Sequence, residues 1–285
     1  MGFSFDGTAL FPRAPLPPGP RVDGRPFQVT RRGGIVPSVE PPGARGRAGP
    51  HWRDDRSGGA AVGETRTSGA GEGYDARPFV PEKAGLARLR EAAEGCQGCP
   101  LYREATQTVF GAGETSARLV FVGEQPGDQE DRQGQPFVGP AGGVLRRAIE
   151  EAGIDPAWAY VTNAVKHFKF EQAARGKRRI HKAPGLREIS ACKPWLVAEL
   201  RLIDPEVVVA LGASAGKSLL GSSFRVTEQR GVALPMPALD GGGPGAGTLV
   251  ATIHPSAVLR SDSAAREAAY TGLVADLRVA AELLD

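Results

Sequence analysis

A histidine stands inside a run of cations in GKRRIHKAPG, residues 176–185. Neighbouring positive charges disfavour a protonated imidazole, so we expect His181 to be neutral, and a neutral imidazole is both a nucleophile and a base. The stretch can instead be read as a phosphate-binding loop in which the histidine takes no part. The cations expected to keep the ring neutral, or to hold phosphate, are Lys177, Arg178, Arg179 and Lys182.

A second chemistry-bearing stretch is GEQPGDQEDRQGQPFVGPAG, residues 123–142. Its glycines and prolines predict tight turns, so that Glu124, Gln125 and Asp128 can face one pocket. Phe137 can stack on a planar base, or it can be a core aromatic residue. An acid, an amide and an aromatic ring in one turn favour a ligand site.

Two more polar residues follow apolar segments. Asn163 carries a paired donor and acceptor that could read the edge of a base, or it could satisfy local backbone groups. His254, in the tripeptide HPS at 254–256, could donate a hydrogen bond to a leaving-group oxygen or could anchor the next loop. Ser256 of the same motif is a candidate DNA contact.

The three cysteines are candidate metal ligands. Cys96 and Cys99 are separated by two residues, and Cys192 lies far downstream. Two thiolates at this spacing can hold a metal or a cluster edge, although buried free thiols are the alternative. A fourth ligand would have to be a histidine, and His167 remains once His181, His254 and the N-terminal His51 are set aside. On ligand type alone, three cysteines and a histidine favour zinc.

Apolar segments alternate with helical ones after residue 79, and this positions the motifs. We expect strands at 117–124, 159–167, 206–212 and 248–255, and helices within 81–96, 141–152, 185–203, 213–221 and 263–284. The pattern predicts an α/β fold of three layers (α/β/α) with a four-stranded, mainly parallel central sheet. Ligands bind at the carboxyl ends of such strands, where the polar motifs fall.

Composition divides the chain of 285 residues. Residues 1–74 contain 15 glycines, 10 prolines, ten arginines and no lysine, so we expect a disordered extension over 1–78 and a folded domain over 79–285. The extension is a linker or an auxiliary DNA contact. No apolar run could span a bilayer, no secretory signal is evident, and the cysteines suit a reducing compartment. We expect a cytoplasmic protein.

Taken together, Cys96-x-x-Cys99, GE-x-PG, TNAVK and HPS resemble the uracil-DNA glycosylase superfamily, and look like its family 4, iron–sulfur branch. The KRRIH loop resembles the UdgX-type subgroup. The likeness covers roughly residues 79–284 and does not reach residues 1–74.

This resemblance implies a role for each motif residue. It makes Cys96, Cys99 and Cys192, with His167 in place of another cysteine, ligands of a [4Fe–4S] cluster, with zinc as the alternative. Uracil would stack on Phe137, meet Asn163, Gln125 and Asp128, and be stabilised by His254. Gln125 stands where hydrolytic relatives place a water-activating aspartate, which puts repeated turnover in doubt.

The implied activity is single-turnover uracil-DNA glycosylase chemistry that ends in a covalent bond between His181 and C1′ of the sugar. Glu124 would take the imidazole proton or stabilise the sugar cation. A conventional multiple-turnover enzyme and a non-catalytic uracil-DNA binding module are the alternatives. The expected partner is uracil-containing DNA, preferably single-stranded, because an unpaired base is easier to extrude. We expect a monomer.

Overall fold

The computed structural model describes residues 73–174, 178–239, 245 and 247–284. Most of the predicted N-terminal extension, up to residue 72, lies outside the described residues, and its disorder stays a prediction. Packing of the described chain begins before residue 79. Ala76 is buried, and its amide donates to the carbonyl of Ala191 at 3.0 Å. No described helix is long and apolar enough to cross a membrane.

A five-stranded sheet forms the centre of the described domain, in the order β2-β1-β5-β7-β6. Four strands are parallel, and β6 pairs antiparallel with β7. The parallel strands are short and almost wholly buried, as expected of strands covered on both faces. The bounds are β1 (Leu119–Gly123), β2 (Ala159–Asn163), β5 (Val207–Leu211), β6 (Ala233–Pro235) and β7 (Thr248–Thr252).

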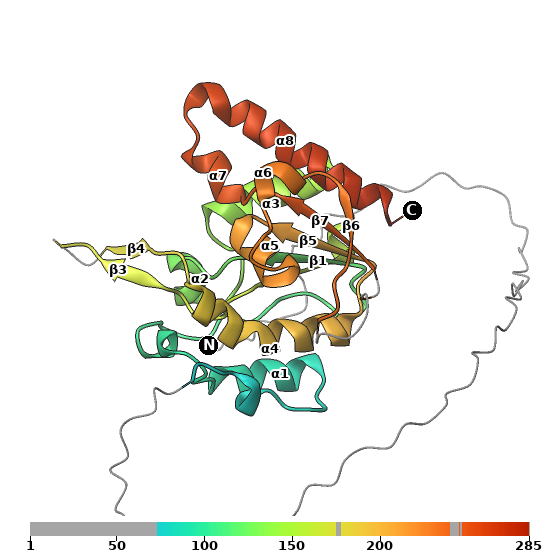
Figure 1. Cartoon of the computed structure of the whole chain (residues 1–285). Coiled ribbons are helices and arrows are strands. Elements are labelled where there is room, and N and C mark those ends of the chain that lie inside the picture. The colour runs from blue at the N-terminus through green and yellow to red at the C-terminus, as the bar shows by residue number, and fades with distance from the viewer. Residues whose placement is uncertain (1–72, 175–177, 240–244, 246, 285) are drawn as a thin grey trace, which may run out of the picture. The chain divides into compact units, whose positions relative to one another are not determined.

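Helices cover both faces of the sheet (Figure 1). Successive side chains of a strand point to opposite faces. Leu119 and Phe121 of β1 pack in a cluster with residues of α3 and α8, whereas Val120 and Val122 pack with residues of α4 and α5. The helices are α2 (Asp128–Gln133), α3 (Pro140–Glu151), α4 (Leu186–Ile203), α5 (Ala213–Leu220), α6 (Val226–Gln229), α7 (Pro255–Arg260) and α8 (Ser263–Glu282).

A third cluster lies beyond α4 and holds the cysteines. Helix α1 (Leu86–Glu94) contributes Leu89 and Ala93, and α4 contributes Trp195, which is fully buried. Cys96, Cys99 and Cys192 belong to the same cluster. The 3-10 turns of the domain are η1 (Arg77–Phe79), η2 (Pro100–Arg103) and η3 (Pro156–Trp158).

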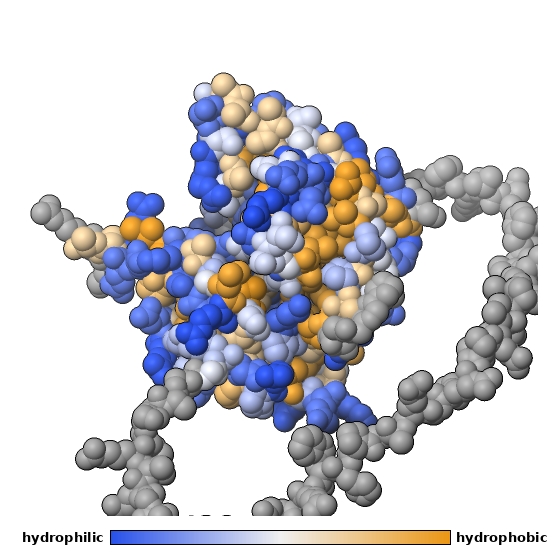
Figure 2. Space-filling view, in the orientation of Figure 1, coloured by the Kyte–Doolittle hydropathy of each residue, from blue (hydrophilic) through white to orange (hydrophobic). Residues whose placement is uncertain are grey.

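An antiparallel hairpin projects from the body of the domain (Figure 1). It consists of β3 (Phe170–Gln172) and β4 (Arg179–His181), with Phe170 opposite His181. Figure 2 shows hydrophilic and hydrophobic residues mixed over the hairpin and α8, and more hydrophobic residues gathered on the side of the β6 edge of the sheet.

The predicted α/β class with a mainly parallel sheet is confirmed, and three details differ. The sheet has five strands rather than four, because β6 is a three-residue edge strand (Ala233–Pro235) that contains proline and has no alternating pattern. Strand β2 ends at Asn163, four residues before its predicted end. Helix α1 begins at Leu86, because Gly85 is an extended N-cap.

Candidate functional site

The polar motifs meet at the carboxyl edge of the parallel strands, as the sequence predicts. Gly123, the last residue of β1, is in register with Asn163, the last residue of β2. Glu124 follows β1, and His254 follows β7 as the N-cap of α7. These strand ends enclose a pocket of about 560 Å³, which is lined by Glu124, Gln125, Gly127, Glu130, Phe137, Ala141, Asn163, Ile180, His181, Ala183, His254, Ser256 and Arg260.

One wall of the pocket is formed by Phe137 and Asn163, which both pack against Gly123. A Cβ atom on Gly123 would lie 2.3 Å from Asn163 Oδ1 and 2.7 Å from Phe137 Cζ, so glycine is needed here. Phe137 has a φ of 56°, a conformation that costs a non-glycine residue about 1–3 kcal/mol. Arg146 Nη1 donates to its carbonyl at 3.1 Å. The fold therefore holds this ring in place against a conformational cost.

The Asn163 side chain is available to a ligand. It is buried, and its amide makes no hydrogen bond to any described residue. Every described side-chain polar atom that is shielded from solvent has a hydrogen-bond partner. The amide atoms of Asn163 have none, so they are accessible from the pocket that this residue lines. An open amide presents one acceptor and two donors in a plane, which suits the edge of a nucleobase.

His254 is held as a neutral imidazole with its proton on Nε2. The backbone amide of Ser256 donates to His254 Nδ1 at 3.2 Å, and the Ser256 Oγ lies 2.7 Å from the same nitrogen. Arg260 Nη1 donates to that Oγ at 2.8 Å, so the hydroxyl proton is directed at Nδ1. Burial, helped by the charges of Arg260 and His181, lowers the pKa of His254 to about 4. The remaining N–H can donate to a ligand in the pocket.

His181 and Glu124 lie next to each other in the lining of the pocket. His181 Nε2 lies 3.5 Å from Glu124 Oε1, and the imidazole is about half exposed at 49%. The other carboxylate oxygen, Oε2, accepts a hydrogen bond from the hydroxyl of Ser214 in α5. Ser214 therefore fixes the carboxylate with one oxygen directed at the imidazole.

Gln125 binds the backbone at the base of the hairpin. Its Oε1 accepts from the amide of Lys169 at 3.1 Å, and its Nε2 donates to the carbonyls of Lys169 and Lys182, both at 3.1 Å. These partners fix the amide orientation. Gln125 Nε2 also lies 3.0 Å from His181 Nε2, so the same amide group contacts both the backbone and the imidazole of the hairpin.

The cations of the KRRIH loop are largely paired. Arg179 contacts two carboxylates, and Lys182 pairs with Glu171. Carboxylates thus offset the charges of both side chains, and the predicted effect of these cations on the imidazole and on phosphate stays a prediction. Arg178 is exposed and makes no ion pair with a described residue. Lys177 lies outside the described residues.

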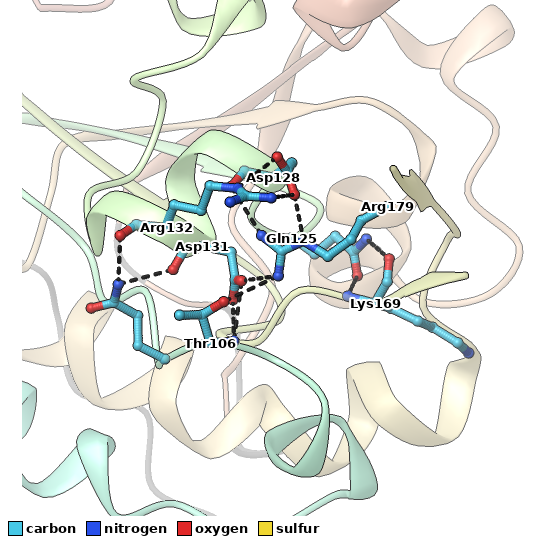
Figure 3. Close-up of polar contacts among 8 residues, drawn as sticks. Thr106, Gln125, Asp128, Asp131, Arg132, Lys169 and Arg179 are labelled. Carbon is cyan, nitrogen blue, oxygen red and sulfur yellow. Dashed lines mark hydrogen bonds and ion pairs between the residues drawn. The ribbon is translucent and has the colours of Figure 1, made fainter. Parts of the chain in front are cut away.

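Asp128 does not line the pocket, in contrast to its predicted contact with a base. It pairs with Arg179 at 2.5 Å and with Arg132 at 2.9 Å, and these partners lower its pKa against the effect of desolvation. Figure 3 shows Arg179 between Asp128 and Asp131. The reason is local: Asp128 opens helix α2, one turn before Arg132, so its carboxylate turns toward these cations.

Sequence reasoning missed Glu130 and Arg260, which line the pocket, and Ser214, which contacts Glu124 without lining it. Glu130 is buried in the wall and accepts from the amide of Gly139 at 2.8 Å. Ser214 reaches Glu124 from α5. Their only sequence signal is position: Glu130 lies in the polar run after β1, and Ser214 lies three residues after β5.

The three predicted thiol ligands are free, buried and close enough to interact electrostatically. Burial raises the pKa of the Cys192 thiol to about 12, and the other two thiols contribute to this rise. Hydrogen-bond donors point at two of the sulfurs. Trp195 Nε1 donates to Cys96 Sγ at 3.2 Å, and the Lys166 amide donates to Cys192 Sγ at 3.3 Å. Donors of this kind stabilise metal-bound thiolates.

The candidate fourth ligand, His167, is oriented by Thr108. The Thr108 hydroxyl donates to the Ala93 carbonyl at 2.9 Å, so its oxygen accepts from His167 Nε2 at 2.9 Å. Nδ1 is then the nitrogen with a lone pair, and burial lowers the pKa of the ring to about 4, which keeps it in the metal-binding form. Within the described ranges, no three His, Cys, Asp or Glu side chains converge on one metal-ion position.

A family model described as "Uracil DNA glycosylase superfamily" matches residues 110–278 of the chain. The matched region starts after the first two cysteines and includes every strand of the central sheet and the pocket at their carboxyl ends.

Similar proteins carry the corresponding name. The chain is 36% identical over 176 residues to a type-4 uracil-DNA glycosylase from Thermotoga maritima, covering 61% of this chain and 83% of the relative. It is 32% identical over 176 residues to a type-4 uracil-DNA glycosylase from Pyrobaculum aerophilum, covering 61% and 85%. A type-5 uracil-DNA glycosylase from P. aerophilum is 30% identical over 123 residues, covering 38% and 50%.

Proposed function

The chain belongs to the uracil DNA glycosylase superfamily, and from this premise we propose that it cleaves the N-glycosidic bond of deoxyuridine in DNA and ends covalently attached to the sugar. The observation that carries the covalent step is the position of His181. Its Nε2 lies 3.5 Å from Glu124 Oε1 in a pocket that also holds Phe137, Asn163 and His254.

Base recognition belongs to one side of the pocket. Phe137 supports the flat face of uracil, and the open amide of Asn163 pairs with its edge. As the bond between C1′ and the base breaks, its electron pair leaves with uracil. His254 donates from Nε2 to the uracil oxygen on which this negative charge develops, and a neutral donor suits this task because it need not lose its proton.

His181 attacks from the other side. The sugar acquires oxocarbenium character at C1′, and the Nε2 lone pair forms the new bond there. Attack from Nε2 requires the ring proton on Nδ1, so the product is a cationic N-alkylimidazolium and the released base is an anion. Glu124 stabilises first the sugar cation and then the imidazolium.

Gln125 explains why water does not compete. An amide cannot act as the base that activates water, and this amide is already occupied by the hairpin backbone. An alkylated imidazole with no activated water beside it is a poor leaving group, so the adduct persists and the enzyme acts once.

We assign a [4Fe–4S] cluster to Cys96, Cys99, Cys192 and His167. A single zinc ion with bonds of about 2.3 Å would draw its ligands onto one point, whereas a cluster binds each ligand at a separate iron. The described thiols lie in one apolar cluster, and hydrogen-bond donors point at two of the sulfurs, which supports a thiolate-bound group there. Its role is to hold the surrounding segments together.

The substrate is uracil in DNA, with single strands preferred because extrusion then breaks no base pair. Among the described residues, Arg178 and Ser256 are the candidates for phosphate contacts, and Lys177 of the same loop is a further candidate. Arg179 and Lys182 are paired within the protein. We place the protein in the cytoplasm, because its thiols are unpaired, and treat it as a monomer.

Two alternatives remain for the same pocket. A conventional type-4 glycosylase would release uracil repeatedly while the hairpin only binds DNA. A binding module would hold uracil without releasing it. Glu124 and His254 line the same pocket, and this pairing of a carboxylate with a hydrogen-bond donor favours catalysis over mere binding.

The test is a denaturing gel. The purified chain is mixed with a uracil-containing single-stranded oligonucleotide, boiled in SDS and compared with a thymine oligonucleotide. We expect a uracil-dependent band at the summed mass, with one uracil released per chain. His181→Ala should abolish the band, and mass spectrometry should find the sugar on His181.

Arg178→Gln is the matched control, because it changes an exposed residue of the same loop without touching the imidazole. It should keep the adduct and weaken binding at higher salt. An undiminished band with His181→Ala contradicts the nucleophile, repeated release without a band supports the conventional enzyme, and neither release nor a band supports the binding module.

A further inference from the structure

A buried lysine lies directly behind the pocket and has no part in the chemistry proposed above. The Lys166 side chain is 1% exposed and pairs with Glu199, which is fully buried, at 2.5 Å. Taking both charges out of water is costly, and apolar pairs of similar volume are often as stable. A buried ion pair therefore needs a reason other than stability.

The ammonium group of Lys166 makes three hydrogen bonds. It donates to Glu199 Oε2, to Thr162 Oγ1 at 2.6 Å and to the backbone carbonyl of Asn163 at 2.8 Å. Its positive charge also lies over the ring of Phe110, 5.4 Å from the centroid. All three donors are thus used, and two of them act on the last two residues of β2.

Glu199 completes the arrangement from α4. Its Oε1 accepts from the amide of Gly111 at 3.1 Å and from the hydroxyl of Tyr160 at 2.9 Å, and both oxygens lie near Thr162 Oγ1. Desolvation and the negative charge of Glu199 raise the pKa of the Tyr160 hydroxyl well above its usual value, so the hydroxyl keeps its proton and donates. The network thereby fixes β2 to α4 at the end that carries Asn163.

We propose that Lys166 is a positioning residue for uracil recognition, holding Asn163 through its backbone carbonyl so that its amide faces the pocket. This rests on the proposed role of Asn163. Asn163 has no side-chain hydrogen bond to another described residue, so its orientation depends on its backbone and on the contact with Gly123. A buried ammonium suits the task, because it bonds one carbonyl, one hydroxyl and one carboxylate at once.

Lys166 also links the pocket to the thiol cluster, since its backbone amide donates to Cys192 Sγ at 3.3 Å. The side chain acts on Asn163 and the main chain acts on the thiol. A side-chain substitution should consequently disturb uracil recognition and leave the metal content unchanged.

The test is a double-mutant cycle on binding in the full chain. Lys166→Met is combined with Glu199→Gln, so that no buried carboxylate is left unpaired. Affinity is measured for a single strand with one non-cleavable 2′-fluoro-deoxyuridine and for the thymidine strand. We expect the preference for uracil to fall about tenfold in the Lys166→Met/Glu199→Gln protein, equivalent to ~1.4 kcal/mol. Asn163→Ala should lower it at least as much.

If Lys166 acts through Asn163, the protein that carries Lys166→Met, Glu199→Gln and Asn163→Ala should show the same preference for uracil as the Asn163→Ala protein. Additive losses overturn the proposal. So does a loss of iron or of visible absorption parallel to the loss of preference. Leu277→Ala, a core truncation in α8 remote from this network, is the stability control, and it should unfold more easily while keeping its preference. An unchanged preference with Asn163→Ala alone instead contradicts the base-reading role of Asn163 in the proposed function.

Discussion

At the scale of single residues, the site depends on which nitrogen of each imidazole carries a proton. His254 receives hydrogen bonds at Nδ1 and keeps its proton on Nε2. The proposed attack by His181 needs the opposite tautomer, with the lone pair on Nε2 and the proton on Nδ1. Ser256 fixes the tautomer of His254, and the proposed roles of the two rings follow from this difference.

The state of His254 gives a prediction for pH. Its pKa in the fold is about 4, below the ordinary value near 6.5, so the unfolded chain binds more protons between these values. Stability should be complete above about pH 6.5 and fall as pH drops toward about 4, by ~1–3 kcal/mol for this partly exposed ring. Long-range ¹H–¹⁵N NMR should report a neutral ring at pH 6 with its proton on Nε2.

Arg260→Gln removes a charge that helps to lower the pKa of His254, so the NMR titration midpoint should move upward. Arg278→Gln, which changes a cation at the far end of α8, is the control and should leave the midpoint unchanged. A ring that titrates near 6.5 in the unmodified chain would contradict the neutral-donor role.

At this scale, sequence reasoning placed some site residues correctly and others not. Asn163, His181, His254 and Glu124 line one pocket because each lies at a strand end or in the adjoining hairpin, and strand ends can be inferred from apolar runs. Asp128 belongs to a different contact, because its direction depends on a helix that starts at this residue. Ion pairing between distant segments cannot be read from spacing.

At the scale of elements, Arg179 holds the β3–β4 hairpin to α2. Its side chain is 9% exposed, lies over the rings of Phe168 and Phe170, and contacts Asp128 and Asp131 (Figure 3). The Asp131 carboxylate is fully buried and has Arg179 as its ion-pair partner. Gln125 provides a second attachment, at the base of the hairpin. The position of His181 depends on both.

Arg179→Met should therefore loosen the hairpin and slow adduct formation. Removing one partner of a buried pair costs ~3–5 kcal/mol, and partial relaxation at this edge should leave a loss of ~1–3 kcal/mol. We expect faster amide exchange in residues 169–172 and 179–182 and a drop in the adduct rate of at least about tenfold, or ~1.4 kcal/mol in the barrier.

Arg132→Met is the matched control, because its pair with Asp128 is exposed and should be worth at most about 1 kcal/mol. It should leave hairpin exchange and adduct rate close to those of the unmodified chain. Weaker DNA binding with an unchanged hairpin in Arg179→Met would instead indicate that this guanidinium contacts phosphate.

Element types were readable wherever an element is long and apolar. Strands β1 and β5 and helices α4 and α8 were predicted within a few residues of their bounds. The hairpin escaped prediction, because each strand has three residues and exposed polar side chains, as in Phe170–Gln172. Its formation depends on tertiary contacts with α2 and with Gln125, which the local sequence does not encode.

At the scale of the whole described domain, three apolar clusters are arranged side by side, two on the faces of the sheet and one beyond α4. The third joins the segment from Ala76 to Leu101 to α4, and it contains all three cysteines. It has fewer buried residues than the other two clusters, and three of them are thiols. We therefore expect the proposed cluster of iron and sulfur to supply much of the cohesion there.

Metal removal should consequently act on one part of the domain first. Protein purified without oxygen should be brown with about four irons per chain, and a chelator with an oxidant should bleach it. In the bleached protein, amide exchange should rise at least about tenfold in residues 86–105, while β1 and β5 keep their protection, because local opening follows the weakest cluster.

Cys99→Ser should reproduce this exchange pattern without the chelator, and Ser190→Ala, on the same helix as Cys192, should not. A colourless protein with one zinc overturns the cluster. Unchanged exchange after bleaching overturns its structural role, since the apolar contacts of Leu89 and Trp195 would then suffice to hold α1 against α4.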